Sequence, residues 1–311
     1  MDKLTIFTGK ANDKLAHGIC DSLGVSPGQI KVARFLDGET RVKIDQNIRG
    51  KDVFIVQSTC YPANENLMEL LIMIDAAKRA SARRITAVLP YFGYARQDRK
   101  DQPRVPITAK LVANLLTRAG AHRIITVDLH AGQIQGFFDI PLDHLYAVSI
   151  FEEYFKQKKL EDIVIVSPDV GGIKMARAYA KRFEAGLAIV DKRRISDSEA
   201  EVMHIMGDVE GKNVILVDDI VATAGSLAEA VVALKKNGAK DIYAAITHPV
   251  LCGPAIERIE ASELKELVVT DTIPIEDARR SKRIAQLSVA SLLGEAIKRI
   301  HNEESISVLF E

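Results

Sequence analysis

The stretch "VILVDDIVATAGS", residues 214–226, decides how the fold is interpreted. It begins with a run of mostly β-branched apolar residues, which is typical of a strand buried inside a sheet. The run then meets two adjacent carboxylates, Asp218 and Asp219, and passes into small and hydroxylated residues. Burying an unpaired carboxylate is strongly unfavourable. We therefore expect the strand to end at Val217 and the two aspartates to serve a ligand beyond its carboxyl end.

The same kind of apolar run alternates with helical patterns along the whole chain. Strands are expected at Leu4–Phe7, Val53–Gln57, Ile85–Leu89, Ile124–Leu129, Ile163–Ser167, Val214–Val217 and Ile242–Ile246. Amphipathic helices are expected at Glu65–Ala80 and Ser226–Asn237, and the second stops at Gly238. Such alternation predicts an α/β fold built on mainly parallel sheets.

Three related helix-turn-strand phrases are typical of any α/β fold, and they also fit a chain with two similar α/β domains. They are "RASARRITAVLP" (79–90), "TRAGAHRIITVDLH" (117–130) and "KKNGAKDIYAAITH" (235–248). We place the first domain at residues 1–146 and the second at residues 147–311. The boundary falls near Leu145–Ser149, and the C-terminal helix is free to pack back on the first domain.

Composition excludes several classes of partner. Lys and Arg total 42 and Asp and Glu total 42, so no overall cationic field attracts nucleic acid, and Trp is absent from any base-stacking surface. No apolar run approaches membrane-spanning length, and the N-terminus lacks a signal-peptide core. Cys20, Cys60 and Cys252 lie far apart without metal-ligand spacing. We therefore expect a cytoplasmic protein with reduced thiols and no membrane partner.

The residues after the aspartates form a candidate phosphate site. In parallel sheets, ligands bind beyond the carboxyl ends of the strands. The segment from Ala222 to Ser226 offers small side chains, backbone N–H groups and a helix N-terminus, all of which favour a phosphate. Carboxylates beside it can accept hydrogen bonds from vicinal hydroxyls, which indicates a sugar phosphate. The alternative is an ordinary helix cap at Thr223 or Ser226, with Asp219 solvated.

Two further segments carry polar residues directly after predicted strands. The first, "VLPYFGYARQDRKDQPRVPIT" (88–108), is a cationic stretch able to fold over a polyphosphate, or else a solvated surface loop. The second, "TVDLHAGQIQGFF" (126–138), places Asp128 and His130 at a strand end. On its own, a histidine in this position is more often structural than a ligand.

Residues 214–226 resemble the loop that binds phosphoribosyl diphosphate (PRPP) in type I phosphoribosyltransferase folds. From "FLDGE" (35–39) to "SISVLF" (305–310), the chain is similar to the main, phosphate-activated class of ribose-phosphate diphosphokinases, also called PRPP synthetases. The resemblance implies two phosphoribosyltransferase-type domains, an ATP-side N-terminal one and a C-terminal one with the ribose-5-phosphate loop. It also implies transfer of the β,γ-diphosphate of ATP to the anomeric hydroxyl of ribose 5-phosphate, giving PRPP and AMP for nucleotide biosynthesis.

The resemblance assigns roles to individual residues. Phe35, Asp37, Glu39, Arg96 and Gln97 would bind ATP, while His130 and Asp169 of "SPDVGG" (167–172) would bind Mg²⁺. Lys192 and Arg194 of "VDKRR" (190–194) would be catalytic, stabilising charge as in other phosphoryl transfers. The ribose-5-phosphate site would comprise Asp218, Asp219, Ala222, Thr223, Ala224, Gly225 and Ser226. No residue is assigned as general base.

Regulation and two departures also follow from the resemblance. The class forms homohexamers, needs inorganic phosphate and is inhibited by ADP, and the matching positions here are Arg49, Ser81, Arg104, Ser305 and Ser307. The family loop usually has Asp where Ala222 stands and Thr where Ser226 stands.

Two other functions remain open. A non-catalytic, PRPP-synthetase-associated regulatory subunit would carry an insertion and altered residues in the catalytic loop, whereas "DKRR" is uninterrupted here. A nucleobase phosphoribosyltransferase would leave residues 1–146 without a purpose.

Overall fold

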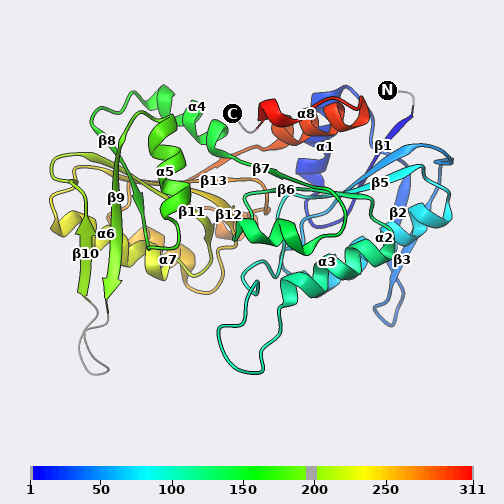
Figure 1. Cartoon of the computed structure of the whole chain (residues 1–311), viewed down its shortest axis with the longest axis horizontal. Helices are drawn as coiled ribbons and strands as arrows, with labels where there is room; N and C mark the ends of the chain where they lie inside the picture. The colour runs from blue at the N-terminus through cyan, green and yellow to red at the C-terminus, as the bar shows by residue number, and fades with distance from the viewer. Residues whose placement is uncertain (1–2, 194–201, 310–311) are drawn as a thin grey trace. The chain divides into compact units, whose positions relative to one another are not determined.

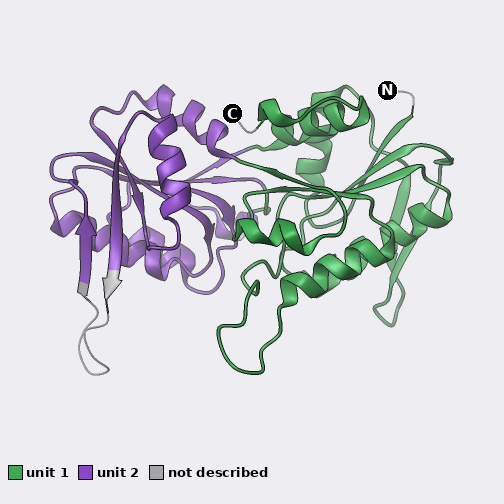
Figure 2. Cartoon of the chain, viewed as in Figure 1, with its two compact units in different colours: residues 1–146, 272–274, 288–311 green, residues 147–271, 275–287 purple. Residues whose placement is uncertain are grey.

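The structure is a computed structural model that describes residues 3–193 and 202–309. The chain divides into two compact units (Figure 2). Unit 1 comprises residues 1–146, 272–274 and 288–311, and unit 2 comprises residues 147–271 and 275–287. Each unit is built on a mainly parallel sheet flanked by helices, so the predicted α/β class with two such domains is confirmed. Among the described residues, no helix combines the length and the apolarity needed to cross a membrane.

Unit 1 is built on a five-stranded parallel sheet. Its strands, in spatial order, are β1 (Leu4–Thr8), β4 (Asp52–Val56), β5 (Arg84–Leu89), β6 (Arg123–Val127) and β7 (Leu142–Leu145). The helices are α1 (Asp13–Leu23), α2 (Ala63–Arg79), α3 (Thr108–Ala119) and α8 (Ala290–His301), with short turns η1 (Gly132–Phe137) and η3 (Ser307–Leu309). Helices α1 and α8 pack together on one face of the sheet, and α2 and α3 cover the other (Figure 1).

A separate hairpin of unit 1 was not predicted. Strands β2 (Ile30–Arg34) and β3 (Thr40–Ile44) pair antiparallel, and "FLDGE" forms the turn between them. Its turn needs Gly38, whose φ of 93° is a conformation that other residues rarely adopt. Both strands alternate partly buried with exposed residues, and β3 packs on α2. The hairpin therefore holds the "FLDGE" residues away from the main sheet.

Unit 2 is built on a seven-stranded sheet. Its strands, in spatial order, are β10 (Val202–Met206), β9 (Gly186–Arg193), β8 (Ile163–Ser167), β11 (Asn213–Val221), β12 (Ile242–Pro249), β13 (Glu266–Thr270) and β14 (Ile284–Leu287). All neighbours pair parallel except β10 with β9. The helices are α4 (Val148–Lys158), α5 (Ile173–Arg182), α6 (Gly225–Lys236) and α7 (Ala255–Ala261), with a short turn η2 (Asp277–Arg279).

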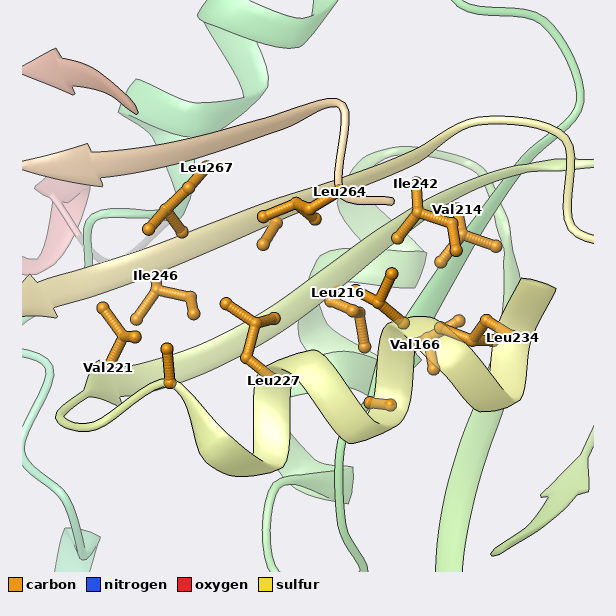
Figure 3. Close-up of a cluster of buried hydrophobic side chains, with 14 of the residues drawn as sticks. Val166, Val214, Leu216, Val221, Leu227, Leu234, Ile242, Ile246, Leu264 and Leu267 are labelled. Carbon is orange, nitrogen blue, oxygen red and sulfur yellow. The ribbon is translucent and has the colours of Figure 1, made fainter. Parts of the chain in front are cut away.

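Strand β12 shows how this sheet is buried on both faces. Ile242 and Ile246 point into the apolar cluster that Leu227 and other side chains of α6 complete (Figure 3). The intervening Tyr243 points to the opposite face, where its ring lies edge-on to Phe155 of α4 at 5.9 Å. Successive residues of a strand face opposite sides of a sheet, so apolar residues at consecutive positions require two covering layers.

The predicted end of the decisive strand is wrong. Strand β11 does not stop at Val217 but runs through both aspartates to Val221. The reason is the neighbouring strand β12, which continues the ladder by pairing Asp218 with Ile246 and Val221 with Pro249. Asp219 is therefore buried, with only 8% of its surface exposed. The ligand loop begins later than expected and is only three residues long before α6 starts.

Candidate active site

The loop from Ala222 to Ala224 joins β11 to α6 and has the backbone form of an anion site. Ala224 is left-handed, with φ 56° and ψ 16°, and it precedes the first residue of the helix, Gly225. A left-handed residue next to helical ones turns successive N–H groups toward one point, the concavity called a nest. No side chain caps α6, so the alternative role of Thr223 or Ser226 as its cap is not found.

The two carboxylates before the loop influence each other. The backbone N–H of Asp219 donates to Oδ1 of Asp218 at 2.9 Å. The pKa of Asp218 is raised well above its usual 3.8, first because the side chain is desolvated and then because Asp219 lies beside it. The charge of Asp169 raises the pKa further. This edge of unit 2 therefore concentrates negative charge that hydroxyl donors or a cation would stabilise.

Asp169 reaches that edge from the next strand, β8, through a tight turn. Ser167 Oγ donates to the Asp169 carbonyl at 2.7 Å, and the Gly172 N–H donates to Asp169 Oδ1 at 3.0 Å. A Cβ at Gly172 would lie 2.5 Å from Ser167 Oγ, so a side chain there would displace the hydroxyl that holds this turn. Because β8 and β11 are neighbouring parallel strands, Asp169 and Asp218 share one edge of the sheet.

The predicted catalytic residues lie at the carboxyl end of β9, the strand on the other side of β8. Lys192 is the penultimate residue of β9, and its backbone pairs with Met203 of β10. The carboxyl ends of β8, β9 and β11 thus bring the backbone of Lys192 to the edge that carries Asp169 and Asp218. Arg194 lies outside the described residues, as does the Lys192 side chain, so their roles stay predictions.

In unit 1, Arg96 and Gln97 lie in the cationic stretch after β5. Gln97 is the anchor: its carbonyl accepts from the Ala109 N–H at 3.1 Å, and its Oε1 accepts from Thr108 Oγ1 at 2.5 Å. Arg96 is exposed. The exposed His130 follows the adjacent strand β6, so it reaches the same sheet edge as the segment carrying Arg96. A hydrogen bond of 2.7 Å from Gln133 to Asp98 joins this segment to η1.

The predicted ATP-binding residues Phe35, Asp37 and Glu39 lie in the turn of the β2–β3 hairpin, where they combine turn hydrogen bonds with an exposed aromatic ring. The Phe35 N–H donates to the Glu39 carbonyl at 2.8 Å, and Asp37 Oδ1 accepts from the Glu39 N–H at 3.1 Å. The carboxylate of Asp37 therefore shapes the turn. Phe35 is 48% exposed, and the guanidinium carbon of Arg41 lies 5.7 Å from its ring centroid. An exposed aromatic ring beside a cation is suited to stacking with a planar ligand.

Sequence reasoning missed one residue that contacts the candidate phosphate loop. Arg258 of α7 donates from Nη1 to the Thr223 carbonyl at 3.0 Å. It lies in a separate segment of the chain, and nothing in its local sequence marks it as a ligand-site residue.

Comparisons with known proteins decide the family. Residues 4–120 match the family model described as the N-terminal domain of ribose phosphate pyrophosphokinase, and residues 194–311 match one described as the phosphoribosyl synthetase-associated domain. The ribose-phosphate pyrophosphokinase of Bacillus subtilis is 57% identical over 307 residues, which span 99% of this chain and 97% of that protein. The chain belongs to the ribose-phosphate pyrophosphokinase family. The family predicted from the sequence is thereby confirmed.

Other ribose-phosphate pyrophosphokinases and a solved structure agree. The enzyme of Oceanobacillus iheyensis is 55% identical over 308 residues, covering 99% of this chain and 97% of its own. The crystal structure of phosphoribosylpyrophosphate synthetase from Mycobacterium smegmatis is 43% identical, with a TM-score of 0.92 over 97% of this chain and 99% of that one.

The regulatory positions predicted for this pyrophosphokinase fall into local groups within unit 1. Arg49 is exposed, and the N–H of the next residue, Gly50, donates to the Ser81 carbonyl at 2.9 Å. Ser305 Oγ and Ser307 Oγ lie 3.0 Å apart, while Arg104 lies on the cationic stretch. A cavity of about 350 Å³ lies beside the first group and is lined by Lys3, Gly50, Asp52, Arg83, Arg84, His301 and Glu303.

Acidic and histidine side chains do not gather into a metal-binding cluster in the part of the chain that the structure describes. Within residues 3–193 and 202–309, no three His, Cys, Asp or Glu side chains converge as a metal site would require. His130 belongs to unit 1 and Asp169 to unit 2, and each occupies the strand end described above. Their assignment as metal ligands stays a prediction.

Proposed function

We propose that this chain transfers the β,γ-diphosphate of ATP to ribose 5-phosphate, forming PRPP and AMP for nucleotide biosynthesis. The anomeric oxygen attacks the β-phosphorus, and the bond from that phosphorus to the oxygen bridging the α-phosphorus breaks. The bridging oxygen leaves with AMP, and the hydroxyl proton passes to solvent. The observation that carries the proposal is the acidic end of β11 running directly into a phosphate nest. The names of relatives that match over the whole chain support it.

Unit 2 would hold the sugar phosphate. Asp218 and Asp219 accept hydrogen bonds from the ribose hydroxyls, which offsets the desolvation that raises the pKa of Asp218. The loop from Ala222 to Ser226 takes the 5-phosphate through backbone N–H groups at the positive end of α6. Small side chains at Ala222, Ala224 and Gly225 leave those N–H groups accessible to the phosphate oxygens.

Unit 1 would hold the nucleotide. Arg96 offers an exposed guanidinium for the phosphates, and Gln97 sits at the anchored part of the same segment. Phe35 offers an exposed ring for the adenine, with Asp37 and Glu39 in the same turn. We therefore assign ATP to the N-terminal part of the chain and the sugar phosphate to the C-terminal part.

Mg²⁺ is the metal we assign to the reaction. Asp169 supplies a carboxylate, and oxygen ligands are what Mg²⁺ prefers, so this residue fits the ion. His130 is exposed at a strand end of the nucleotide unit, where it can contact the metal-bound nucleotide. When bound, Mg²⁺ neutralises the triphosphate charge. The raised pKa of Asp218 beside Asp169 and Asp219 supports a cation at that edge of unit 2.

Catalysis would rest on fixed positive charge near the reacting phosphates. Lys192 lies one residue before the end of β9, the strand that neighbours β8, and Arg194 follows two residues later. Cations held in place stabilise charge that develops in the transition state, and a single well-placed donor is worth roughly 10²–10³ in rate. No general base is assigned, because metal coordination can acidify the sugar hydroxyl.

Regulation and assembly belong to the same proposal. We expect a homohexamer, activated by inorganic phosphate and inhibited by ADP through Arg49, Ser81, Arg104, Ser305 and Ser307. Lys3, Arg83 and Arg84 line the neighbouring cavity of unit 1 together with the carboxylates of Asp52 and Glu303, and this excess of one positive charge favours an anionic effector nearby. We expect the protein in the cytoplasm, since its three cysteines are free thiols.

The test is an assay of nucleotide products by chromatography. Protein is incubated with ATP, Mg²⁺ and phosphate, together with either ribose 5-phosphate or ribose. We expect AMP in stoichiometric amount with ribose 5-phosphate and little with ribose. ADP as the product, or AMP formed without the sugar phosphate, would contradict the proposal. No turnover at all would favour the regulatory-subunit alternative, and consumption of PRPP with a nucleobase would favour a phosphoribosyltransferase.

A further inference from the structure

Three consecutive carbonyls of the phosphate loop are held by one segment of unit 2. The Val221 carbonyl accepts from the Leu251 N–H at 3.0 Å, and the Ala222 carbonyl accepts from the Cys252 N–H at 2.9 Å. The Thr223 carbonyl accepts from Arg258 Nη1 at 3.0 Å. The donors all belong to residues 251–258, which follow β12 and lead into α7. The loop is therefore tied by its carbonyls along one side.

This arrangement fixes the direction of the loop's N–H groups. In a trans peptide the N–H points opposite to the carbonyl of the same unit, and these peptide bonds are trans. The N–H groups of Ala222, Thr223 and Ala224 therefore point away from residues 251–258. With Ala224 left-handed, they form the donor side of the nest. Holding the carbonyls back keeps their partial negative charge away from a bound anion.

Arg258 is the one side chain among these three donors. It is fixed by the burial of Ala255 and Ile259, its neighbours on α7, in the core of unit 2. The loop also makes room for it: a Cβ at Gly225 would lie 3.2 Å from Arg258 Nη1. A second guanidinium, that of Arg279, donates to the Leu251 carbonyl at 2.7 Å and so helps to hold residues 251–258 in place.

We propose that Arg258 is a positioning residue for the 5-phosphate of the sugar substrate, an inference that rests on the proposed function of the loop. Its hydrogen bond holds the Thr223 carbonyl on the far side of the loop, so that the phosphate meets the Ala224 N–H instead. It acts through the backbone and not by touching the reacting atoms. Losing it frees the Thr223–Ala224 peptide to rotate and present its carbonyl to the anion.

The experiment compares Arg258→Met, Arg258→Lys and wild type. Calorimetry gives the Kd for ribose 5-phosphate and for ATP separately, and the product assay gives turnover. We expect Arg258→Met to raise the Kd for ribose 5-phosphate about tenfold, the effect of losing a charged hydrogen bond, and to change that for ATP less than twofold. Lysine keeps a donor of similar reach, so Arg258→Lys should recover most of the lost affinity.

A matched control separates positioning from general stability. Arg283 Nη1 also donates to backbone carbonyls, those of Ser262 at 2.6 Å and Leu264 at 3.0 Å. These carbonyls precede β13, whereas the phosphate loop follows β11. Because the strands are parallel, the two sites lie at opposite ends of the strands, one at the amino ends and the other at the carboxyl ends. Arg283→Met should lower the melting temperature and leave the Kd for ribose 5-phosphate unchanged.

The outcomes distinguish the two proposals. Normal turnover with an unchanged Kd for ribose 5-phosphate in Arg258→Met would overturn the role of Arg258 alone. An equal rise of that Kd in Arg283→Met would also overturn it, because the effect would then be one of stability. A wild-type protein that neither binds ribose 5-phosphate nor forms AMP would overturn the proposed function and this inference together.

Discussion

The Asp219 N–H donates a 2.9 Å hydrogen bond to Oδ1 of Asp218 inside strand β11, so two consecutive strand residues form an acidic pair. Neighbouring β12 supplies the ladder that keeps them in the strand. Burial, followed by the charge of Asp219, raises the pKa of Asp218 well above its usual 3.8. An acidic pair arranged in this way lowers the stability of the free protein, a cost that hydrogen bonds from the hydroxyls of the proposed sugar phosphate would offset.

Asp218→Asn should therefore stabilise the protein while it weakens binding of the sugar phosphate. Because the pKa of Asp218 is raised in the folded protein, folding favours the neutral side chain. The contribution of this side chain to the free energy of unfolding is complete below its pKa in the unfolded chain. It is lost as the pH rises through its pKa in the folded protein. At pH 8 the free energy of unfolding of the variant should exceed that of the wild type by about 1 kcal/mol, which raises the melting temperature by ~2–4 °C. Both differences should shrink toward pH 4. Thermal unfolding in EDTA measures this. Asp241→Asn, which removes a surface pair with Lys265, is the control and should change stability little.

Ala222→Asp tests the location of the sugar phosphate. A carboxylate at this position would stand beside the bound 5-phosphate, where a charge interacts with it by roughly 1 kcal/mol or more at short range. We expect the KM for ribose 5-phosphate to change about fivefold or more, with the KM for ATP changed less than twofold. Initial-rate kinetics with each substrate varied in turn measure both constants. Equal changes in the two constants would argue that the loop is not the sugar-phosphate site.

Lys192→Ala tests the catalytic assignment. Removal of one fixed cation from the reacting phosphates should lower kcat roughly 10²–10³-fold. ATP binding should remain measurable by calorimetry, because Arg96 and Gln97 lie in the other unit. Lys236→Ala, at the far end of α6, is the matched control and should keep normal kcat. Near-normal turnover of the Lys192 variant would remove this residue from the mechanism.

The three thiols should differ in reactivity. Burial raises the pKa of Cys60 to about 11, and burial together with Asp21 raises that of Cys20 to about 11. At pH 8 about one thousandth of either thiol is ionised, whereas Cys252 is only partly buried. We expect one fast reaction per chain with a thiol reagent, assigned to Cys252 by mass spectrometry, and three after denaturation. Fast labelling of Cys60 in the native protein would show that its surroundings are open.

Apolar patterning was sufficient to predict seven strands of the two main sheets, although β13, which is also buried, was not predicted. Strands such as β5 and β8 are short runs of buried apolar residues, and their predicted bounds agree with the structure within a residue. The β2–β3 hairpin was missed because its strands mix Lys and Arg with half-buried valine and isoleucine. The end of β11 was misplaced because register with β12, and not the local sequence, keeps Asp218 and Asp219 in the strand.

The candidate site was predictable where its residues are contiguous. The stretch from Asp218 to Ser226 contains its own acidic pair, small residues and helix start, so local chemistry was enough to predict a phosphate loop. Arg258 could not be predicted, because it meets Thr223 only after β12 and α7 have folded against the sheet. Hydrogen bonds between distant segments are set by tertiary packing, which no local pattern encodes.

The most direct test of the central claim follows the anomeric oxygen through the reaction. Ribose 5-phosphate carrying ¹⁸O at the anomeric position is mixed with the protein, ATP, Mg²⁺ and phosphate, and the products are observed by ³¹P NMR. Diphosphate transfer predicts AMP together with PRPP in which the phosphorus bonded to the sugar oxygen, formerly the β-phosphorus of ATP, shows the isotope shift of a bond to ¹⁸O. Formation of ADP, or of PRPP from which the label has been lost, would contradict the attack of the sugar oxygen on the β-phosphorus of ATP.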